Sequence, residues 1–390
     1  MSMTQPLRFY VHTPFCLHKC HYCDFNSHVF SNPPWEKYQQ ALLKEIEYYA
    51  QQPQFKQRRI SSIFFGGGTP SLAPPELFEA VLHTLQTHFS FANDIEISLE
   101  ANPGASEAQR FQAYRAAGIN RVSIGVQSFD AAELKWLERI HSADEAIKAY
   151  HIARDAGFDN INLDLMYALP KQSLASWFTT LEKALALEPE HLSCYQLTVE
   201  PHTQLAITHK KQALALPHDD LALDFLWQTR QRLQQAGYQA YEISNFAKAG
   251  KTCQHNQGYW LYDDYVGIGA GAAGKWDAED GGVWRYSNLR SPNTYIDTAL
   301  QHGKAVGSDE YLNLAQAMGE AMWLGLRQSQ GIHIPSFSQR FGNSPQQAYP
   351  QLLQQWLQQE QLKQHQHYLQ LTEQGLNIAD DIAASFLVAV

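Results

Sequence analysis

Short runs of β-branched and aromatic residues alternate with longer amphipathic stretches between positions 7 and 200. This alternation is typical of repeated βα units around a parallel sheet. It predicts six strands, at 7–12, 61–65, 95–100, 121–126, 160–166 and 191–197. The intervening helices are expected near 34–50, 74–89, 106–117, 143–156, 173–187 and 219–236. Six such units favour an α/β fold, an incomplete (β/α)6 barrel of the TIM type.

The cysteines, the glycine run and the polar residues that are candidates for ligand binding lie at the ends of the predicted strands or directly after them. The first strand leads into a loop with three cysteines, and the second into the glycine run 66–70, GGGTP. Glu100 ends the third strand, Gln127 follows the fourth, and Asp164 lies in the fifth. In parallel barrels, ligands bind at the carboxyl ends of the strands. The sequence therefore predicts one site built from five strand ends.

Cys16, Cys20 and Cys23 form a C-x3-C-x2-C set without a fourth cysteine nearby. Three thiolates are what a cubane [4Fe-4S] cluster needs if one iron is to stay open to a ligand that is not protein. A disulfide framework is disfavoured, because the 390 residues contain only five cysteines and no apolar signal segment precedes them. The alternative is a structural zinc site, which takes four ligands. Its fourth ligand would come from His12, His18, His21 or His28.

The other strand-end residues are ambiguous when each is taken singly. Free amides in the glycine run can hold a carboxylate, and Thr69 adds a hydroxyl. A tight turn that ends at Pro70 is an alternative interpretation of the same residues. Glu100 and Asp164 stand in otherwise apolar strands, where an unpaired buried charge is costly. They suit ribose hydroxyls or a cation, and they equally suit a buried ion pair. Together with the cysteines they favour a cofactor pocket.

Charge and hydropathy disfavour two classes of protein. A net charge of −10 with a pI of about 5.9 lacks the basic footprint of a nucleic-acid-binding protein. No apolar run approaches the roughly 18 residues that a membrane span needs. We therefore expect a cytoplasmic protein without a nucleic-acid partner.

Several segments taken together resemble the radical S-adenosylmethionine (SAM) superfamily: YVHTPFC, CLHKCHYC, FFGGGTPS, LEANP, GVQSF and NLDLMYALP. More narrowly, they resemble the branch of oxygen-independent coproporphyrinogen III dehydrogenase and the haem chaperone HemW. The resemblance is dense from Tyr10 to about Pro201 and looser beyond. It implies a partial barrel with a [4Fe-4S] cluster and SAM. In such proteins an electron from the cluster cleaves the sulfonium bond and leaves a 5'-deoxyadenosyl radical, while the protein orients and shields the cofactor.

The resemblance also implies roles for single residues. Cys16, Cys20 and Cys23 bind three irons, and the amino and carboxylate groups of SAM chelate the fourth. The remaining implied SAM contacts are Tyr10 and Tyr22 near the adenine, Gly67, Gly68 and Thr69 at the methionine end, Glu100 and Asp164 on the ribose or sulfonium side, and Gln127 and Arg139. Taken alone, Arg139 would equally suit a helix surface.

Two departures separate this chain from the dehydrogenase pattern. In that pattern a further cysteine follows two residues after the third cluster ligand, where this chain has Phe25. The long N-terminal extension that the dehydrogenase uses near its substrate is also missing. Both departures favour the haem-chaperone branch, which implies haem binding and transfer to an acceptor protein. The alternative is a true dehydrogenase that decarboxylates two propionates, so enzymatic activity is left undecided.

Residues 253–260, CQHNQGYW, resemble the H-N-x-x-Y-W stretch of HemW proteins. Imidazole is a common axial ligand of haem iron, so His255 is the candidate haem ligand and Cys253 a weaker one. A hydrogen-bonded structural histidine is an equal alternative. The following VGIGAGAAGK resembles a glycine-rich motif in which many relatives have His at the position of Ala273. No C-x-x-C-H motif for covalent haem attachment is present.

The pattern changes towards the C-terminus. A helix near 309–327, a second near 346–359 and the extended run YLQLTEQG predict a small α+β, winged-helix-like domain. Its helices carry much Gln and few Lys or Arg, which disfavours DNA binding and fits a cover for the barrel mouth or a contact to a haem acceptor. We divide the chain into a barrel (1–240), a connecting segment (241–305) and a C-terminal domain (306–390). The expected partners are haem, an acceptor such as a membrane-bound respiratory protein, an electron donor for the cluster, and a second copy of the chain.

Overall fold

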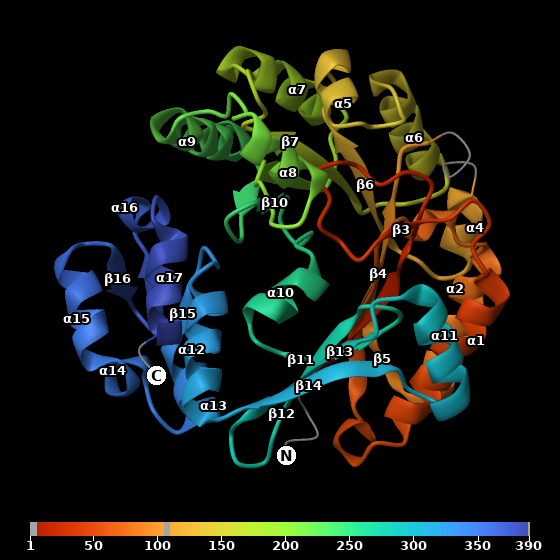
Figure 1. The fold of residues 1–390 in the computed structure, drawn as a ribbon. Helices are drawn as coiled ribbons and strands as arrows, with labels where there is room; N and C mark the ends of the chain where they lie inside the picture. Colours follow the sequence, from red (N-terminus) through yellow and green to blue (C-terminus); the bar gives the residue numbers. More distant parts are fainter. Residues whose placement is uncertain (1–5, 105–109, 389–390) are drawn as a thin grey trace.

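Six parallel strands form the centre of the protein in the computed structural model, which describes residues 6–104 and 110–388 (Figure 1). They lie in the sheet in chain order: β1 (Leu7–Thr13), β4 (Arg59–Gly67), β5 (Ser90–Ala101), β6 (Arg121–Gln127), β7 (Ile161–Tyr167) and β8 (His191–Gln196). The outer face is covered by α1 (Trp35–Ala50), α2 (Pro75–His88), α4 (Phe111–Ala116), α6 (Ala143–Asp155), α7 (Leu174–Ala186) and α9 (Asp219–Gln235). The predicted α/β partial barrel is confirmed.

The two faces of this sheet differ in polarity. On β1, Leu7, Phe9 and Val11 are fully buried in the core beneath the helices. The alternate residues point to the inner, concave face, which is polar although it is also buried. Its members include Arg8, Ser62, Glu96, Ser98, Arg121, Ser123, Asn162, His191 and Ser193. Because buried polar groups need partners, this inner face is held by side-chain hydrogen bonds.

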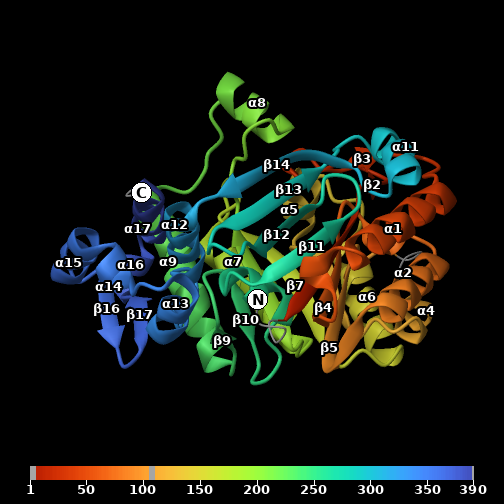
Figure 2. The ribbon, with the colours of Figure 1, turned by 90° about the horizontal axis from the view of Figure 1, so that it is seen from below.

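The predicted strands and helices of this region agree closely with the structure. Two short helices were not predicted: α5 (Ala131–Trp136) and α8 (Gln204–Lys211), which stands out from the body in Figure 2. The helix expected at 106–117 is seen as α4, and residues 105–109 at its start lie outside the described residues.

The sheet continues beyond the barrel at both edges, to twelve strands. β11 (Asp264–Ile268) runs parallel to β1, followed by antiparallel β12 (Ala273–Asp277), β13 (Val283–Asn288) and β14 (Val306–Leu312). The opposite edge carries β10 (Asn245–Ala247) and β9 (Gln239–Ala240). The connecting segment therefore contributes strands to the barrel sheet, and its helix α11 (Pro292–His302) packs on α1.

The helix predicted from residue 309 was wrong at its start. α12 (Leu314–Gly325) begins after Asn313, whose side chain and that of Gln316 form a reciprocal capping box. The residues before this cap pair with β13 instead.

The C-terminal domain has its own hydrophobic core and an antiparallel sheet in the order β15 (Ile332–His333), β17 (Tyr368–Leu371), β16 (Leu362–His365). The second predicted helix is divided into α14 (Pro345–Ala348) and α15 (Pro350–Gln358) at Pro350, which has no N–H to continue a helix. α13 (Ile334–Phe341), α16 (Glu373–Leu376) and α17 (Ala379–Val388) complete this α+β unit. Among the helices of the described chain, none has both the length and the apolar character that a membrane crossing requires.

Glu45, on α1, joins this helix to the extension of the sheet. Its fully buried carboxylate accepts hydrogen bonds from Gly269 N (2.9 Å), Asn288 Nδ2 (2.7 Å) and the Tyr295 hydroxyl (2.5 Å). Burial raises the pKa of Glu45 from its ordinary value of 4.5 to about 7, although the three hydrogen bonds act in the opposite direction.

We expect the stability contributed by neutral Glu45 to be complete below pH 4.5 and to be lost as the pH rises through about 7. Glu45→Gln should remove this pH dependence, and Glu45→Ala should lower the free energy of unfolding by about 2 kcal/mol or more because it leaves buried donors unpaired. Urea unfolding at pH 5 and pH 8 measures both effects. Glu47→Gln, on the exposed face of α1, is the control. An equal pH dependence in wild type and Glu45→Gln would contradict the assignment.

Candidate functional site

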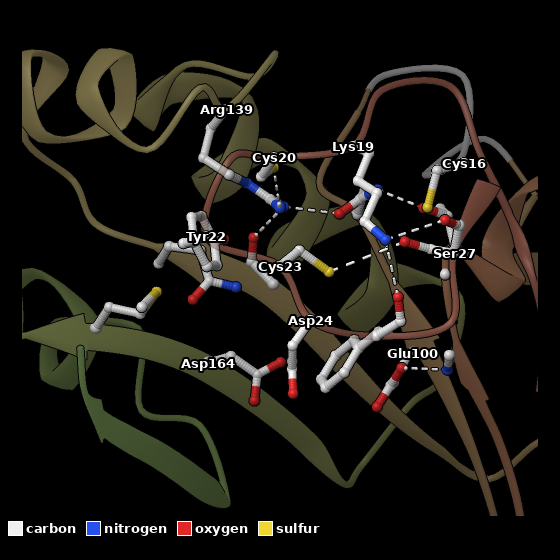
Figure 3. Close-up of a pocket in the computed structure, with 18 of the residues that line it drawn as sticks. Cys16, Lys19, Cys20, Tyr22, Cys23, Asp24, Ser27, Glu100, Arg139 and Asp164 are labelled. Carbon is white, nitrogen blue, oxygen red and sulfur yellow. Dashed lines mark hydrogen bonds between the residues drawn. The ribbon is translucent and has the colours of Figure 1, made fainter. Parts of the chain in front are cut away.

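A cavity of 520 Å³ opens at the carboxyl ends of the barrel strands, where the sequence predicted a site (Figure 3). Most of the predicted site residues line it: Cys16, Cys20, Tyr22, Cys23, Gly67, Gly68, Thr69, Glu100, Gln127, Arg139 and Asp164. Tyr10 and His255 do not line it. The topology brings together residues from the cysteine loop and from the ends of β4, β5, β6 and β7.

The three cysteines lie along one wall of this cavity. Cys16 ends the short strand β2 (Phe15–Cys16), which pairs with β3 (His28–Val29) and closes the loop. The Cys16 sulfur accepts a hydrogen bond from Thr69 Oγ1 (3.4 Å), and the Cys20 sulfur accepts one from Arg139 Nη1 (3.8 Å). Burial raises the pKa of the Cys16 and Cys23 thiols. Thiolates in such a place need a nearby positive centre, so this donor set fits a metal cluster.

The histidines that a zinc site would need make other contacts. His12 Nε2 lies 2.9 Å from the Asn26 carbonyl oxygen, and His28 Nε2 lies 3.3 Å from Asn26 Oδ1. The carboxylate of Glu138 contacts the other two, His18 and His21, at 3.5 and 3.6 Å. Within the residues that the structure describes, no three His, Cys, Asp or Glu side chains are grouped around a single ion position. The described residues therefore do not form the four-ligand arrangement of a structural zinc site.

The backbone amides of the glycine run are hydrogen-bonded within the protein, whereas the sequence predicted that they would be free to bind a ligand. The N–H groups of Gly67, Gly68 and Thr69 donate to Glu100 Oε2 (3.1 Å), Thr13 O (2.7 Å) and Phe15 O (2.9 Å). A Cβ on Gly68 would lie 2.8 Å from the Phe15 carbonyl oxygen and 3.0 Å from the Cys16 sulfur. The absence of side chains therefore lets the end of β4 pack against the cysteine loop. These backbone contacts agree with the alternative prediction that the glycine run forms a tight turn.

Glu100 and Asp164 are half-buried residues whose carboxylates face the cavity. Burial, followed by repulsion from Asp164, raises the pKa of Glu100 to about 8. Burial also raises the pKa of Asp164, although Ser123 Oγ (2.9 Å) and Asn162 Nδ2 (2.8 Å) donate to it. No ion pair involves either carboxylate within the described parts of the chain. Two such carboxylates suit a ligand that brings a positive charge and hydroxyl donors.

Arg139 points into the site, so the helix-surface alternative was wrong. It follows α5, and its Nη2 donates to Asn102 Oδ1 (2.7 Å) and to the Gly125 carbonyl (2.9 Å). Gln127, at the end of β6, has a φ of 65°, a conformation that is uncommon outside glycine and is often found at functional sites. Asn102 was not singled out from the sequence. The signal was its position two residues after Glu100, because strand residues two apart share a face.

Comparisons with known proteins agree with this geometry. A family model described as the radical SAM superfamily matches residues 10–184, and one described as the HemN C-terminal domain matches residues 312–378. The protein named "Heme chaperone HemW" from Haemophilus influenzae is 44% identical over 299 residues, which cover 76% of this chain and 77% of that protein. This chain belongs to the HemW family of radical SAM proteins. The "Heme chaperone HemW" of Bacillus subtilis is 34% identical over 382 residues, which cover 97% and 98% of the two chains.

The solved structure of coproporphyrinogen III oxidase (HemN) from Escherichia coli matches the whole fold of this HemW-family chain. The TM-score is 0.83 at 25% identity, and the match covers 100% of this chain and 91% of that one. Membership of the radical SAM superfamily implies a [4Fe-4S] cluster and SAM. The residues of the cavity fit both groups: thiols on one wall, and on the other two half-buried carboxylates that form no ion pair within the described residues.

Two of the predicted contacts lie outside the cavity of this HemW-family protein. The Tyr10 hydroxyl is 3.0 Å from His12 Nδ1, and its ring stacks on Phe64. His255 lies on α10 (Gln254–Trp260), which sits inside the arc of strands in Figure 1. It is 1% exposed, and its Nδ1 and Nε2 lie 3.0 Å from Ser62 Oγ and from the Tyr259 hydroxyl.

An axial haem ligand needs a nitrogen lone pair directed into open space, and His255 has none in this arrangement. Burial holds the pKa of His255 well below its usual value, so the ring is neutral and fully hydrogen-bonded. Cys253 is also buried, and its thiol donates to Glu96 Oε1 (3.3 Å). The geometry supports the structural alternative for both residues and does not support haem ligation.

We now expect His255→Ala to act on stability. It removes a buried ring and one hydrogen-bond partner each from Ser62 and Tyr259, which should lower the free energy of unfolding by about 2–4 kcal/mol. Thermal unfolding measures this loss, and a haem titration followed by absorbance should give the wild-type affinity. His83→Ala, on the exposed side of α2, is the matched control. Lost haem binding with wild-type unfolding would restore His255 as a ligand.

The glycine-rich stretch VGIGAGAAGK supports the cysteine loop from behind. Asn26 Nδ2 donates to the Ala270 carbonyl (2.9 Å), and a Cβ on Gly271 would lie 2.3 Å from that same nitrogen. Ala273 begins β12 and pairs with Ser287.

Proposed function

We propose that this chain is a haem chaperone that binds haem and transfers it to an acceptor protein. The observation that carries the proposal is its similarity, over 97% of its length, to a protein named "Heme chaperone HemW". Phe25 supports it: this side chain is 55% exposed and lines the same cavity as the cluster cysteines, at the position where the dehydrogenase pattern has a further cysteine.

The proposed site residues divide the work within the cavity. Cys16, Cys20 and Cys23 would hold three irons of the cluster, and Glu100 and Asp164 would accept from ribose hydroxyls and offset the sulfonium charge. Tyr22, Gly67, Gly68, Thr69, Gln127 and Arg139 would complete the SAM pocket. When bound, the cluster would supply one electron to SAM. The protein's own contribution is to bind and orient SAM and to keep water from it.

The second candidate function is that of a coproporphyrinogen III dehydrogenase, which the fold match to the Escherichia coli HemN structure favours. The substitution at Phe25 and an identity of 25% weigh against it. We further propose a cytoplasmic location, an electron-donor protein for the cluster, a homodimer, and the division of the chain at about residues 240 and 305.

The test is an anaerobic reconstitution of the cluster with two assays on the same protein. One adds SAM, a reductant and coproporphyrinogen III, and follows protoporphyrinogen by chromatography. The other titrates haem and then follows its passage from the loaded protein to an apo-haem protein by absorbance. We expect haem binding and transfer without porphyrinogen turnover. Product at many turnovers would make the chain a dehydrogenase, and absent haem binding would overturn the chaperone proposal.

A further inference from the structure

Asn102, immediately after β5, links two residues of the cavity through its side-chain amide. Its Nδ2 donates to Thr69 Oγ1 (3.1 Å), and its Oδ1 accepts from Arg139 Nη2 (2.7 Å). Its backbone N–H donates to Ser71 Oγ (3.3 Å). Both ends of the amide are therefore used: its nitrogen donates to Thr69, which follows β4, and its oxygen accepts from Arg139, which follows α5.

The same two partners contact the sulfurs of cluster cysteines. Thr69 Oγ1 donates to Cys16 Sγ (3.4 Å), and Arg139 Nη1 donates to Cys20 Sγ (3.8 Å), the contact drawn in Figure 3. One amide thus stands at the centre of a chain of hydrogen bonds that runs between two of the three cysteines.

The direction of the hydrogen bond to Thr69 matters for this chain. Because the Asn102 amide donates to the Thr69 oxygen, the hydroxyl hydrogen of Thr69 is left to point at the sulfur of Cys16. A carboxylate at residue 102 would accept that hydrogen and draw it away from the sulfur. The amide therefore sets which way the hydroxyl donates.

Arg139 depends on the same amide for its orientation. Within the part of the chain that the structure describes, its Nε is buried without a hydrogen-bond partner, so the contacts that orient the guanidinium are made by the two Nη atoms. Of the contacts that these atoms make, the one to Asn102 Oδ1 is shorter than those to Gly125 O (2.9 Å) and Cys20 Sγ (3.8 Å). Loss of Asn102 would remove the shortest of these contacts and so weaken the hold that keeps the guanidinium directed at the sulfur.

We propose that Asn102 is a positioning residue that aims Thr69 and Arg139 at the Cys16 and Cys20 sulfurs and so sets the reduction potential of the cluster and the affinity for SAM. Hydrogen bonds to cluster sulfurs stabilise the more negative, reduced state and raise the potential. The inference rests on the part of the proposed function that assigns this cavity to the cluster and SAM, and it does not depend on haem delivery.

Two variants of the reconstituted protein distinguish the hydrogen bond of the Asn102 amide nitrogen to Thr69 from that of the amide oxygen to Arg139. Asn102→Asp keeps an acceptor for Arg139 but takes the Thr69 hydrogen, whereas Asn102→Leu removes both bonds at similar volume. Asn120→Asp is the matched control, because that amide binds the Ile95 carbonyl and the Ile97 N–H away from the cavity. The readouts are the midpoint potential of the cluster without SAM, from an EPR-monitored redox titration, and the dissociation constant of SAM.

We expect both Asn102 variants to take up a full cluster and to shift its potential to more negative values: Asn102→Leu because both sulfur contacts are weakened, and Asn102→Asp because the Thr69 hydrogen is drawn away and a negative charge is added. SAM should bind at least tenfold more weakly to Asn102→Leu, as expected for loss of one charge-assisted hydrogen bond. In a Thr69→Val background, Asn102→Asp should cause a smaller shift, because only its added negative charge, and no longer the loss of the Thr69 hydrogen bond, then acts on the cluster. The control should keep the wild-type potential and affinity.

Wild-type potentials and affinities in both Asn102 variants would overturn the proposal and leave Asn102 a purely structural residue. Failure of both variants to bind iron, with wild-type thermal unfolding, would overturn it too, because a positioning role leaves the cysteines free to bind. These measurements contain no haem or porphyrin. They therefore fail or succeed independently of the haem titration that tests the proposed function.

Discussion

Replacing Cys20 with serine should abolish assembly of the four-iron cluster, with iron per chain falling well below the wild-type value after anaerobic reconstitution. A serine hydroxyl is far less acidic than a thiol and is a poor ligand for the irons. No replacement thiol is at hand, since the two other cysteines, Cys194 and Cys253, are 1% and 0% exposed in the core. Iron and sulfide analysis, together with the EPR spectrum of the reduced protein, measures the loss.

Cys194→Ser is the matched control for this experiment. Cys194 lies on β8 in the hydrophobic core, and burial raises the pKa of its thiol, so it is inert. This variant should load the wild-type amount of iron. A Cys20→Ser protein that still takes up four irons would contradict the ligand assignment and redirect attention to other donors around the cavity.

The strands of the barrel could be read from the sequence because each carries its own local signal. β7, for example, was expected at 160–166 and is found at Ile161–Tyr167, where fully buried aliphatic residues alternate with Asn162 and Asp164. The convergence of Glu100 and Asp164 with the cysteine loop then followed from topology alone. Parallel strands must present their carboxyl ends on one side of the sheet.

The roles that could not be read depend on contacts between distant parts of the chain. The sequence motif around His255 favours a haem ligand. In the structure, however, α10 directs the His255 ring towards Ser62 on β4, which is 193 positions away in the sequence. The amides of the glycine run were expected to be free, but the Thr13 and Phe15 carbonyls accept from the amides of Gly68 and Thr69. Asn102 lies two residues after Glu100, but this spacing does not reveal its partners, because Thr69 follows β4 and Arg139 follows α5.

Glu100→Gln should weaken SAM binding and remove its dependence on pH. The pKa of Glu100 is raised to about 8 in the free protein, first by burial and then by Asp164. A cationic ligand favours the ionised carboxylate, so wild-type binding below about pH 8 must release a proton. The dissociation constant should therefore fall as the pH rises from 6.5, by at most tenfold per unit, and level off above about 8.

A glutamine at residue 100 keeps the shape of the side chain but cannot ionise, so its binding curve should be flat with pH. Loss of a charged acceptor should cost about 10- to 100-fold in affinity at pH 8.5. Asp164→Asn supplies the sharper control, because it removes the charge that helps to raise the pKa of Glu100. The midpoint of its pH profile should move below 8, whereas the Glu100→Gln profile has no midpoint to move. A Glu100→Gln protein with the wild-type pH profile would assign the titration to another group, and Asp164 would be the first to examine because burial raises its pKa as well.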